Sequence, residues 1–161
     1  LDGATDGCRP VLIRPYMSPT APFLEFSVVW NDEDLQEVVV SASSGLFSGK
    51  VNLYGGPHEL KAVADLFQGF PASNDDVRDI QLGQDALSGY GTARLSVYCT
   101  NSRGHLEIEV AMRTMPASLS KRPESAVVVV PGVVGDLDRF VAELRMANNQ
   151  VGARATLRST A

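Results

Sequence analysis

The sequence predicts an α+β fold in which two amphipathic helices pack against a largely antiparallel sheet of about seven to eight strands. The first observation behind this prediction is a strand–glycine–helix unit that occurs twice. Its first copy is Val51–Gly55 and its second is Val128–Gly132. The helix after each strand repeats apolar residues at i, i+3, i+4 and i+7, which makes one apolar stripe. The two stripes are Leu60, Val63, Ala64, Phe67 and Leu137, Phe140, Val141, Leu144.

An apolar stripe must be covered, so we expect both helices side by side on one sheet face. The second observation is a series of short alternating segments at hairpin spacing, which favours antiparallel pairing. The expected strands are 23–31, 35–43, 50–54, 77–82, the two arms of a hairpin over 92–114, and 126–130, with a further segment at 10–16.

Two of these strands make specific predictions. In the strand 23–31, Leu24, Phe26, Val28 and Trp30 alternate and should share the buried face. The segment Ala126–Val130 has no polar side, so we expect it in the centre of the sheet.

The clearest hairpin is Thr92–Thr114, whose turn at 101–104 ends in a glycine. Its inward residues are predicted to be Leu95, Val97, Cys99, Leu106, Ile108, Val110 and Met112. On its solvent face we expect Arg94 and Arg113 to pair with Glu107 and Glu109 across the strands.

Composition is typical of a soluble globular protein, with 44% hydrophobic and 20% charged residues among 161. We expect one domain spanning 1–161, with poorly ordered tails at 1–9 and 148–161. No apolar run approaches the roughly 20 residues of a membrane helix, so the sequence predicts no membrane partner.

The cysteine content favours a reducing, cytoplasmic compartment. Cys8 and Cys99 are too few for a disulfide framework and lack C-x-x-C spacing. We therefore interpret them as unpaired thiols, and a bridge between them remains the alternative.

The net charge of −5 is unevenly distributed, because acids outnumber bases in residues 1–90 and bases outnumber acids in the remainder. An acidic first half repels nucleic acid and suits a basic protein partner. The residues predicted to form the acidic surface are Asp32, Glu33, Asp34, Glu37, Asp75, Asp76 and Asp79. The alternative interpretation is that these acids only solvate loops.

Catalytic and metal signatures are missing from the sequence. His58 and His105 have no second His or Cys at ligand spacing, so we predict neither a metal nor a cofactor. An alternative function is a small-molecule or anion site, either binding or hydrolytic, at Gly55, Gly56 and His58. These residues open the first helix, and a helix N-terminus attracts anions.

The segments Gly104–Val110 and Leu137–Phe140, together with the strand–helix pattern, resemble small uncharacterised bacterial α+β domains. Some of those domains look like immunity proteins that neutralise polymorphic toxins. The resemblance implies a non-enzymatic, protein-binding role, and no catalytic residue carries over from it. The sequence therefore favours a domain that binds, and inhibits, a basic partner protein. A homodimer is the expectation if an apolar stripe proves exposed.

Overall fold

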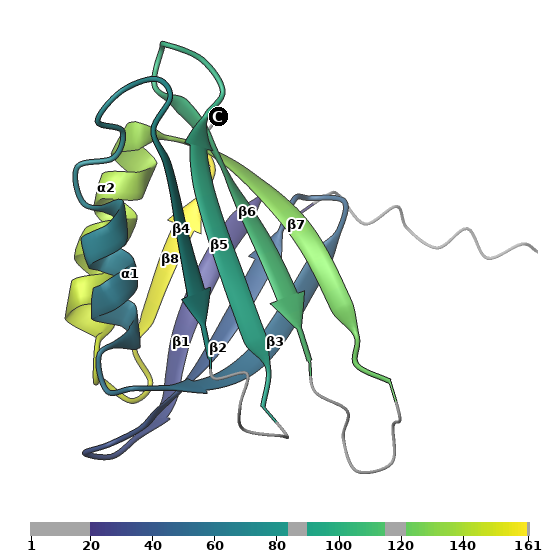
Figure 1. Ribbon diagram of the computed structural model, residues 1–161, viewed down its shortest axis with the longest axis vertical. Helices are drawn as coiled ribbons and strands as arrows, with labels where there is room; N and C mark the ends of the chain where they lie inside the picture. The colour runs from purple at the N-terminus through teal and green to yellow at the C-terminus, as the bar shows by residue number, and fades with distance from the viewer. Residues whose placement is uncertain (1–19, 84–89, 115–121, 161) are drawn as a thin grey trace, which may run out of the picture.

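The structure is a computed structural model that describes residues 20–83, 90–114 and 122–160. Within these ranges the chain forms eight strands and two helices (Figure 1). The first half contains β1 (Phe23–Asn31), β2 (Gln36–Ser43), β3 (Ser48–Gly55), α1 (Glu59–Phe67) and β4 (Val77–Leu82). The second half contains β5 (Thr92–Cys99), β6 (His105–Arg113), β7 (Ser125–Val133), α2 (Val134–Ala147) and β8 (Arg154–Arg158). The predicted segment 10–16, the tail 1–9 and Cys8 lie outside the described residues.

The α+β class is confirmed, and the strands divide between two antiparallel sheets instead of one. The strand orders are β3-β2-β1-β8 and β4-β5-β6-β7. Each half is a three-stranded meander, then a helix, then a fourth strand. The helix carries the chain away from its own meander, so β4 pairs with β5 and β8 pairs with β1. The repeat seen in the sequence is therefore a repeat of topology, and each sheet is completed by the other half.

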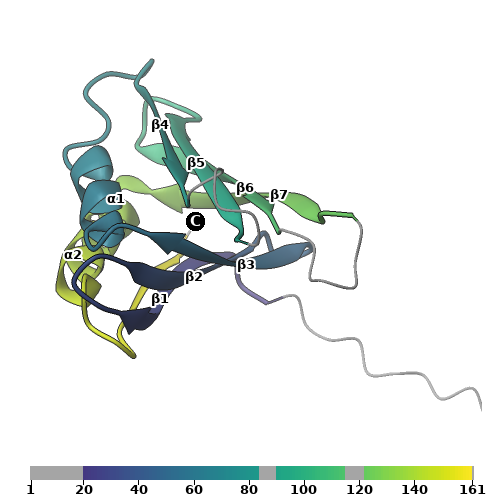
Figure 2. The same cartoon turned by 60° about the horizontal axis from the view of Figure 1, so that its bottom comes forward.

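The core lies between the sheets, and the helices close one side of it (Figure 2). The two predicted stripes are buried, from Leu60 to Phe67 in α1 and from Leu137 to Leu144 in α2. The helices pack side by side, and Arg145 Nη1 lies 2.9 Å from Asp65 Oδ1 across their contact. The burial predicted from helical periodicity is confirmed. The surface that covers the stripes consists of both sheets and the neighbouring helix.

The described part of the segment 148–161, residues 148–160, is not the poorly ordered tail that the sequence predicts. It contains β8, which pairs with β1 from Phe23↔Arg158 to Ser27↔Arg154. Ala155 and Leu157 of β8 are buried. The alternation of these two residues is too short to stand out in the sequence, and the strand depends on pairing with a distant edge.

The prediction that 126–130 is central was wrong, since β7 forms an edge of the second sheet. Its inward residues Val128 and Val130 are buried, whereas Val127 is 62% exposed. An apolar outer side therefore does not mark a central strand here.

The hairpin of β5 and β6 is confirmed, with Leu95 facing Val110 and Val97 facing Ile108 in its register. The prediction that Arg94 and Arg113 form ion pairs with Glu107 and Glu109 across this hairpin was wrong. Arg94 Nη2 pairs with Asp79 of β4 at 3.0 Å, and Glu107 accepts a 2.7 Å hydrogen bond from the Tyr98 hydroxyl. The difference arises because β4 lies beside β5 and offers Arg94 a nearer carboxylate.

Candidate functional site

The seven acids predicted to form one surface lie in separate parts of the fold. Asp32, Glu33 and Asp34 form the turn between β1 and β2, and Glu37 follows on β2. Asp75 and Asp76 lie in the loop from α1 to β4, and Asp79 lies on β4 in the other sheet. In Figure 1 the β1–β2 turn and the α1–β4 loop lie at opposite ends of the molecule.

Asp76 and Asp79 already have basic partners. Asp76 pairs with Arg78 at 2.7 Å and accepts a 2.7 Å hydrogen bond from the Ala72 amide. The Arg78 hydrogen bond, followed by the Ala72 amide, lowers the pKa of Asp76. Asp79 pairs with Arg94. Asp76 thus organises the α1–β4 loop, and the charges of both carboxylates are offset by a neighbouring arginine.

The acids near the β1–β2 turn have no such partner, since none of the ion pairs found among the described residues involves Asp32, Glu33, Asp34 or Glu37. Asp32 Oδ1 accepts hydrogen bonds of 2.8 Å from the amides of Asp34 and Leu35, which fixes the turn. Glu33 and Asp34 are exposed. This end of the first sheet therefore presents four carboxylates on an ordered backbone.

Aromatic side chains accompany these acids on the outer face of the first sheet. The register aligns Trp30 with Glu37 on β2 and Glu37 with Tyr54 on β3. The Tyr90 ring lies beyond Tyr54, with ring centroids 4.3 Å apart and an angle of 51°. Trp30 is 44% exposed and Tyr90 38% exposed. We call this surface the acidic–aromatic face, formed by Trp30, Asp32, Glu33, Asp34, Glu37, Tyr54 and Tyr90.

The outward position of Trp30 corrects the prediction that it shares the buried face with Leu24, Phe26 and Val28. The register of β1 against β2 shifts between Val28 and Trp30. A bulge inserts one residue, so the side chains after it project from the opposite face. Both Val29 and Trp30 are exposed as a result.

Glu37 holds the centre of the acidic–aromatic face. Its Oε1 accepts a 3.1 Å hydrogen bond from Asn52 Nδ2, and Tyr54 lies opposite it in the register of β3. The interaction with the Glu37 carboxylate, followed by partial burial, raises the pKa of Tyr54 above its usual value. Glu37 thus lies between the two aromatic positions, and Asn52 holds its carboxylate.

Glu37→Gln should bring the pKa of Tyr54 down toward its ordinary value of about 10. A raised pKa in the folded state means that the interaction of Tyr54 with Glu37 stabilises the protein below the unfolded pKa, and that the stabilisation disappears as pH rises through the folded pKa. The pKa of Tyr54 is measured from the ¹³C chemical shift of its ζ carbon as a function of pH, with Glu33→Gln as the control. An unchanged Tyr54 titration in Glu37→Gln contradicts the assignment.

The proposed anion site at Gly55, Gly56 and His58 is filled by the chain itself. Glu59 Oε1 accepts a 3.1 Å hydrogen bond from the Gly56 amide, and its side chain leaves no room for a Cβ at Gly55. Asn148 Oδ1 accepts from the Lys61 amide at 3.3 Å. A carboxylate at the helix start repels a second anion, and burial raises the pKa of Glu59 against the effect of the Gly56 amide. His58 is exposed beside Lys61, whose ammonium already pairs with Asp65 at 2.6 Å. The geometry therefore does not favour this alternative.

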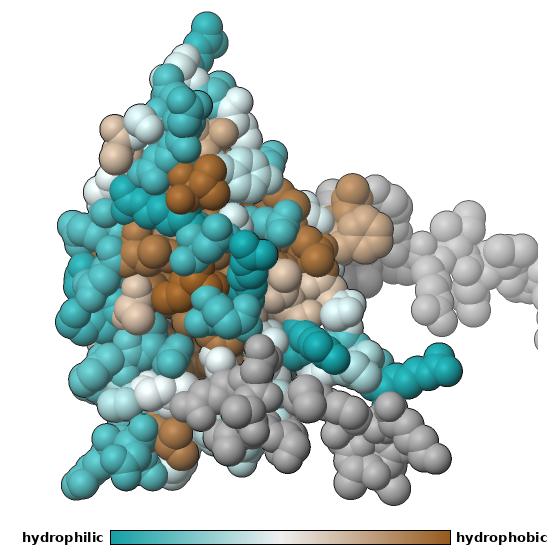
Figure 3. Space-filling model, viewed as in Figure 1, coloured by the Kyte–Doolittle hydropathy of each residue, from teal (hydrophilic) through white to brown (hydrophobic). Residues whose placement is uncertain are grey.

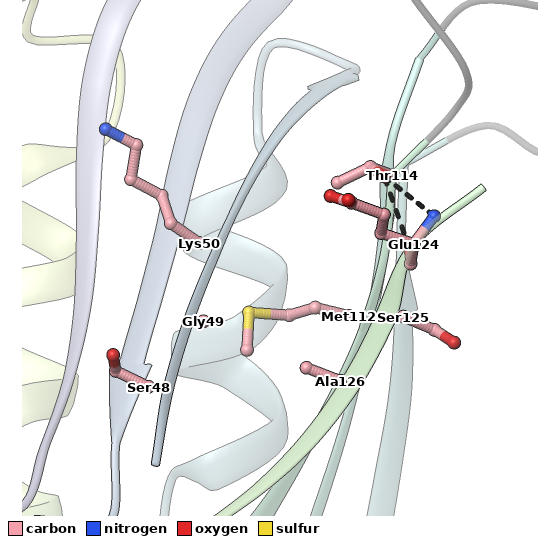
Figure 4. Close-up of a pocket in the computed structure, with 8 residues that line it drawn as sticks. All are labelled: Ser48, Gly49, Lys50, Met112, Thr114, Glu124, Ser125 and Ala126. Atoms are coloured by element: carbon pink, nitrogen blue, oxygen red, sulfur yellow. Dashed lines mark hydrogen bonds between the residues drawn. The ribbon is translucent and has the colours of Figure 1, made fainter. Parts of the chain in front are cut away.

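A cavity of about 260 Å³ lies where β3 approaches β6 and β7. Figure 4 shows Gly49, Met112 and Ala126 facing this space, whereas Lys50 and Ser48 point away from it. Thr114 and Glu124 bond each other through the Thr114 hydroxyl and the Glu124 backbone. The cavity lacks convergent reactive groups, so we assign no chemistry to it.

Metal and membrane signals are also missing from the described part of the chain. No group of three His, Cys, Asp or Glu side chains there could hold a metal ion. Among residues 20–83, 90–114 and 122–160, no helix is long and apolar enough to cross a membrane.

Sequence reasoning found the acids of the acidic–aromatic face and missed its aromatic residues. Trp30 was assigned inward because the bulge leaves no clear mark in the sequence, and Tyr90 meets Tyr54 only through the fold. Comparisons with models of protein families, with curated proteins and with solved structures found no match. The functional argument therefore depends on the geometry of this chain.

Proposed function

We propose that the chain is a non-enzymatic protein-binding domain that uses the acidic–aromatic face to bind a basic segment of a partner protein. The observation that carries the proposal is the row Trp30, Glu37, Tyr54, which alternates aromatic and acidic side chains across three paired strands. An inhibitor of a basic protein, the role implied by the resemblance to immunity proteins, is one form of this function.

The chemistry of this row suits arginine and lysine side chains. A carboxylate accepts a charge-assisted hydrogen bond from a guanidinium, and an aromatic face attracts the same cation when it lies within about 6 Å. Tryptophan and tyrosine are also the residues that most often anchor protein interfaces. Glu37 lies between Trp30 and Tyr54, so one cation at this position could meet both kinds of group.

The turn at Asp32, Glu33 and Asp34 adds a negative field next to the row. Complementary charges speed the encounter of two proteins, and salt weakens this effect. The turn backbone is fixed by the hydrogen bonds of Asp32, so little conformational entropy remains to be lost on binding.

Trp30 gives a direct test, because it is the only tryptophan in the chain. We expect its fluorescence to change when an arginine-rich peptide is added at low salt, and not with a glycine–serine peptide of equal length. Glu33→Lys combined with Asp34→Lys should weaken binding at least about tenfold, which corresponds to about 1.4 kcal/mol. Asp75→Lys combined with Asp79→Lys is the matched control, since both acids lie outside the face.

The same two double variants can be used to capture the natural partner from an extract of the native host at low salt, and the amounts of captured partner are then compared. Binding that is equally strong in both double variants would show that the acidic–aromatic face is not the contact surface. No fluorescence change with the arginine-rich peptide, together with no captured protein, would reject the proposed function as a whole.

A further inference from the structure

The strand β7 leaves an uncharged edge on the second sheet. Its sequence from Ser125 to Val133 contains no charged residue, whereas β4 at the opposite edge carries Arg78 and Asp79. In the described part of the chain β7 pairs with β6 alone. Natural proteins usually protect such edges with charges, because an exposed apolar edge strand pairs with other strands.

Two backbone hydrogen bonds at the ends of the β6–β7 pair show which backbone groups face the free edge. The Thr114 amide donates to the Glu124 carbonyl at 2.8 Å, and the Val134 amide donates to the Gly104 carbonyl at 3.0 Å. In an antiparallel pair the bonded residues alternate, so even-numbered residues of β7 bond β6 and odd-numbered residues face outward. The outward set therefore includes Ser125, Val127 and Val129.

Two prolines delimit this free edge. Pro131 belongs to the outward set, where its lack of an N–H leaves the ladder to β6 intact. Pro123 has the same parity just before the strand. Neither proline has an N–H to donate. The outward residues between them each offer both an N–H and a C=O group to a new strand, and Val127 is the midpoint of that interval.

The side chains on this edge match the backbone pattern. Val127 projects from the outer face and is 62% exposed, and Val129 and Pro131 beside it are partly exposed. Figure 3 shows hydrophobic surface over β7 on this side of the molecule.

We propose that β7 pairs antiparallel with β7 of a second copy of this chain, around a two-fold axis at Val127. Ser125 then bonds Val129 of the second copy, Val127 bonds its own equivalent, and the prolines of the two strands lie opposite each other at the ends. Because β7 has no charged residue, pairing two copies of it places no like charges opposite each other. The two-fold axis also gives a hydrogen-bonding partner to every outward N–H group between the two prolines. An unrelated strand has no reason to match this spacing, so the edge favours a second copy.

Amide hydrogen exchange by NMR tests the pairing residue by residue, with sedimentation to measure the molecular mass. In the dimer the amides of Ser125, Val127 and Val129 should exchange at least about tenfold more slowly than in the monomer obtained on dilution. The amides of Val128 and Val130 bond β6 and serve as internal controls that stay protected in both states.

Val127→Lys should abolish the dimer and the protection of the three outward amides. Val77→Lys is the matched control, because Val77 is a 57% exposed valine on β4, at the other edge of the same sheet. A wild-type protein that sediments as a monomer at every concentration overturns the proposal, whatever else binds the edge. A dimer that survives in Val127→Lys, or one that Val77→Lys disrupts equally, also overturns it.

Discussion

Phe140→Ala should lower the free energy of unfolding by about 3–5 kcal/mol, the range for a large aromatic side chain removed from a core. Phe140 is fully buried on α2, and its ring lies 5.9 Å from that of Phe26 on β1 with an angle of 50°. Truncation removes this contact and leaves a cavity, because close-packed neighbours relax only in part. Denaturant unfolding followed by circular dichroism measures the loss.

Phe47→Ala is the matched control, since Phe47 is the same residue type and is 74% exposed in the β2–β3 turn. We expect it to change stability by no more than about 0.5 kcal/mol. Phe67→Ala, on the corresponding stripe of α1, should fall in the same range as Phe140→Ala. If Phe140→Ala proves as mild as Phe47→Ala, the core assignment of both stripes is wrong.

The elements that the sequence predicted are those whose cause is local. The spacing of Leu60, Val63 and Phe67 indicated a buried helix face whatever lies opposite, and α1 buries that face. The segment Val77–Leu82 was predicted with its observed bounds. Alternation and turn residues also predicted the hairpin of β5 and β6, because a hairpin depends on neighbouring residues.

The division into two sheets depends on pairing between distant segments. β8 pairs with β1, and no local pattern in 154–158 names that partner. The edge position of β7 has the same origin. Its apolar outer side looks central in sequence, and only the strand order shows that the side opposite β6 is unpaired.

For the candidate site, composition identified acids and could not tell which of them are already paired. The sequence does not distinguish Asp79 from Asp34, yet in the fold Asp79 forms an ion pair with Arg94 on the adjacent strand β5. Trp30 shows the second limit, since one bulge reverses the face of every side chain after it. The acidic–aromatic face thus combines a charge pattern that the sequence reveals with an aromatic row that pairing and one irregularity create.

Arg78→Ala should lower the free energy of unfolding by about 3 kcal/mol, because one side chain satisfies several acceptors at the end of α1. Arg78 Nη1 donates to the carbonyls of Leu66 and Gln68 at 2.8 Å, and Nη2 donates to the Gly69 carbonyl at 3.2 Å. The last carbonyls of a helix have no partner within the helix. The guanidinium also lies over the Phe70 ring at 5.4 Å. Its removal leaves the part-buried Leu66 carbonyl without this donor, and water replaces the arginine at the exposed Gln68 and Gly69 carbonyls.

Two further variants separate this role from simple loss of charge. Arg94→Ala removes an exposed arginine from its pair with Asp79 and should change stability by no more than about 1 kcal/mol. Arg78→Lys keeps the charge but lacks the planar fork that reaches several carbonyls at once, so its loss should approach that of Arg78→Ala.

The pH dependence of stability gives a separate test. Arg78 and the Ala72 amide lower the pKa of Asp76, so the Asp76 carboxylate stabilises the fold above its unfolded pKa. This stabilisation is lost as pH falls through the folded pKa. The difference between wild type and Arg78→Ala should therefore narrow in acid. A difference that stays constant there would mean that the carbonyl contacts alone account for the effect, and an Arg78→Ala loss no larger than that of Arg94→Ala would contradict the assigned role.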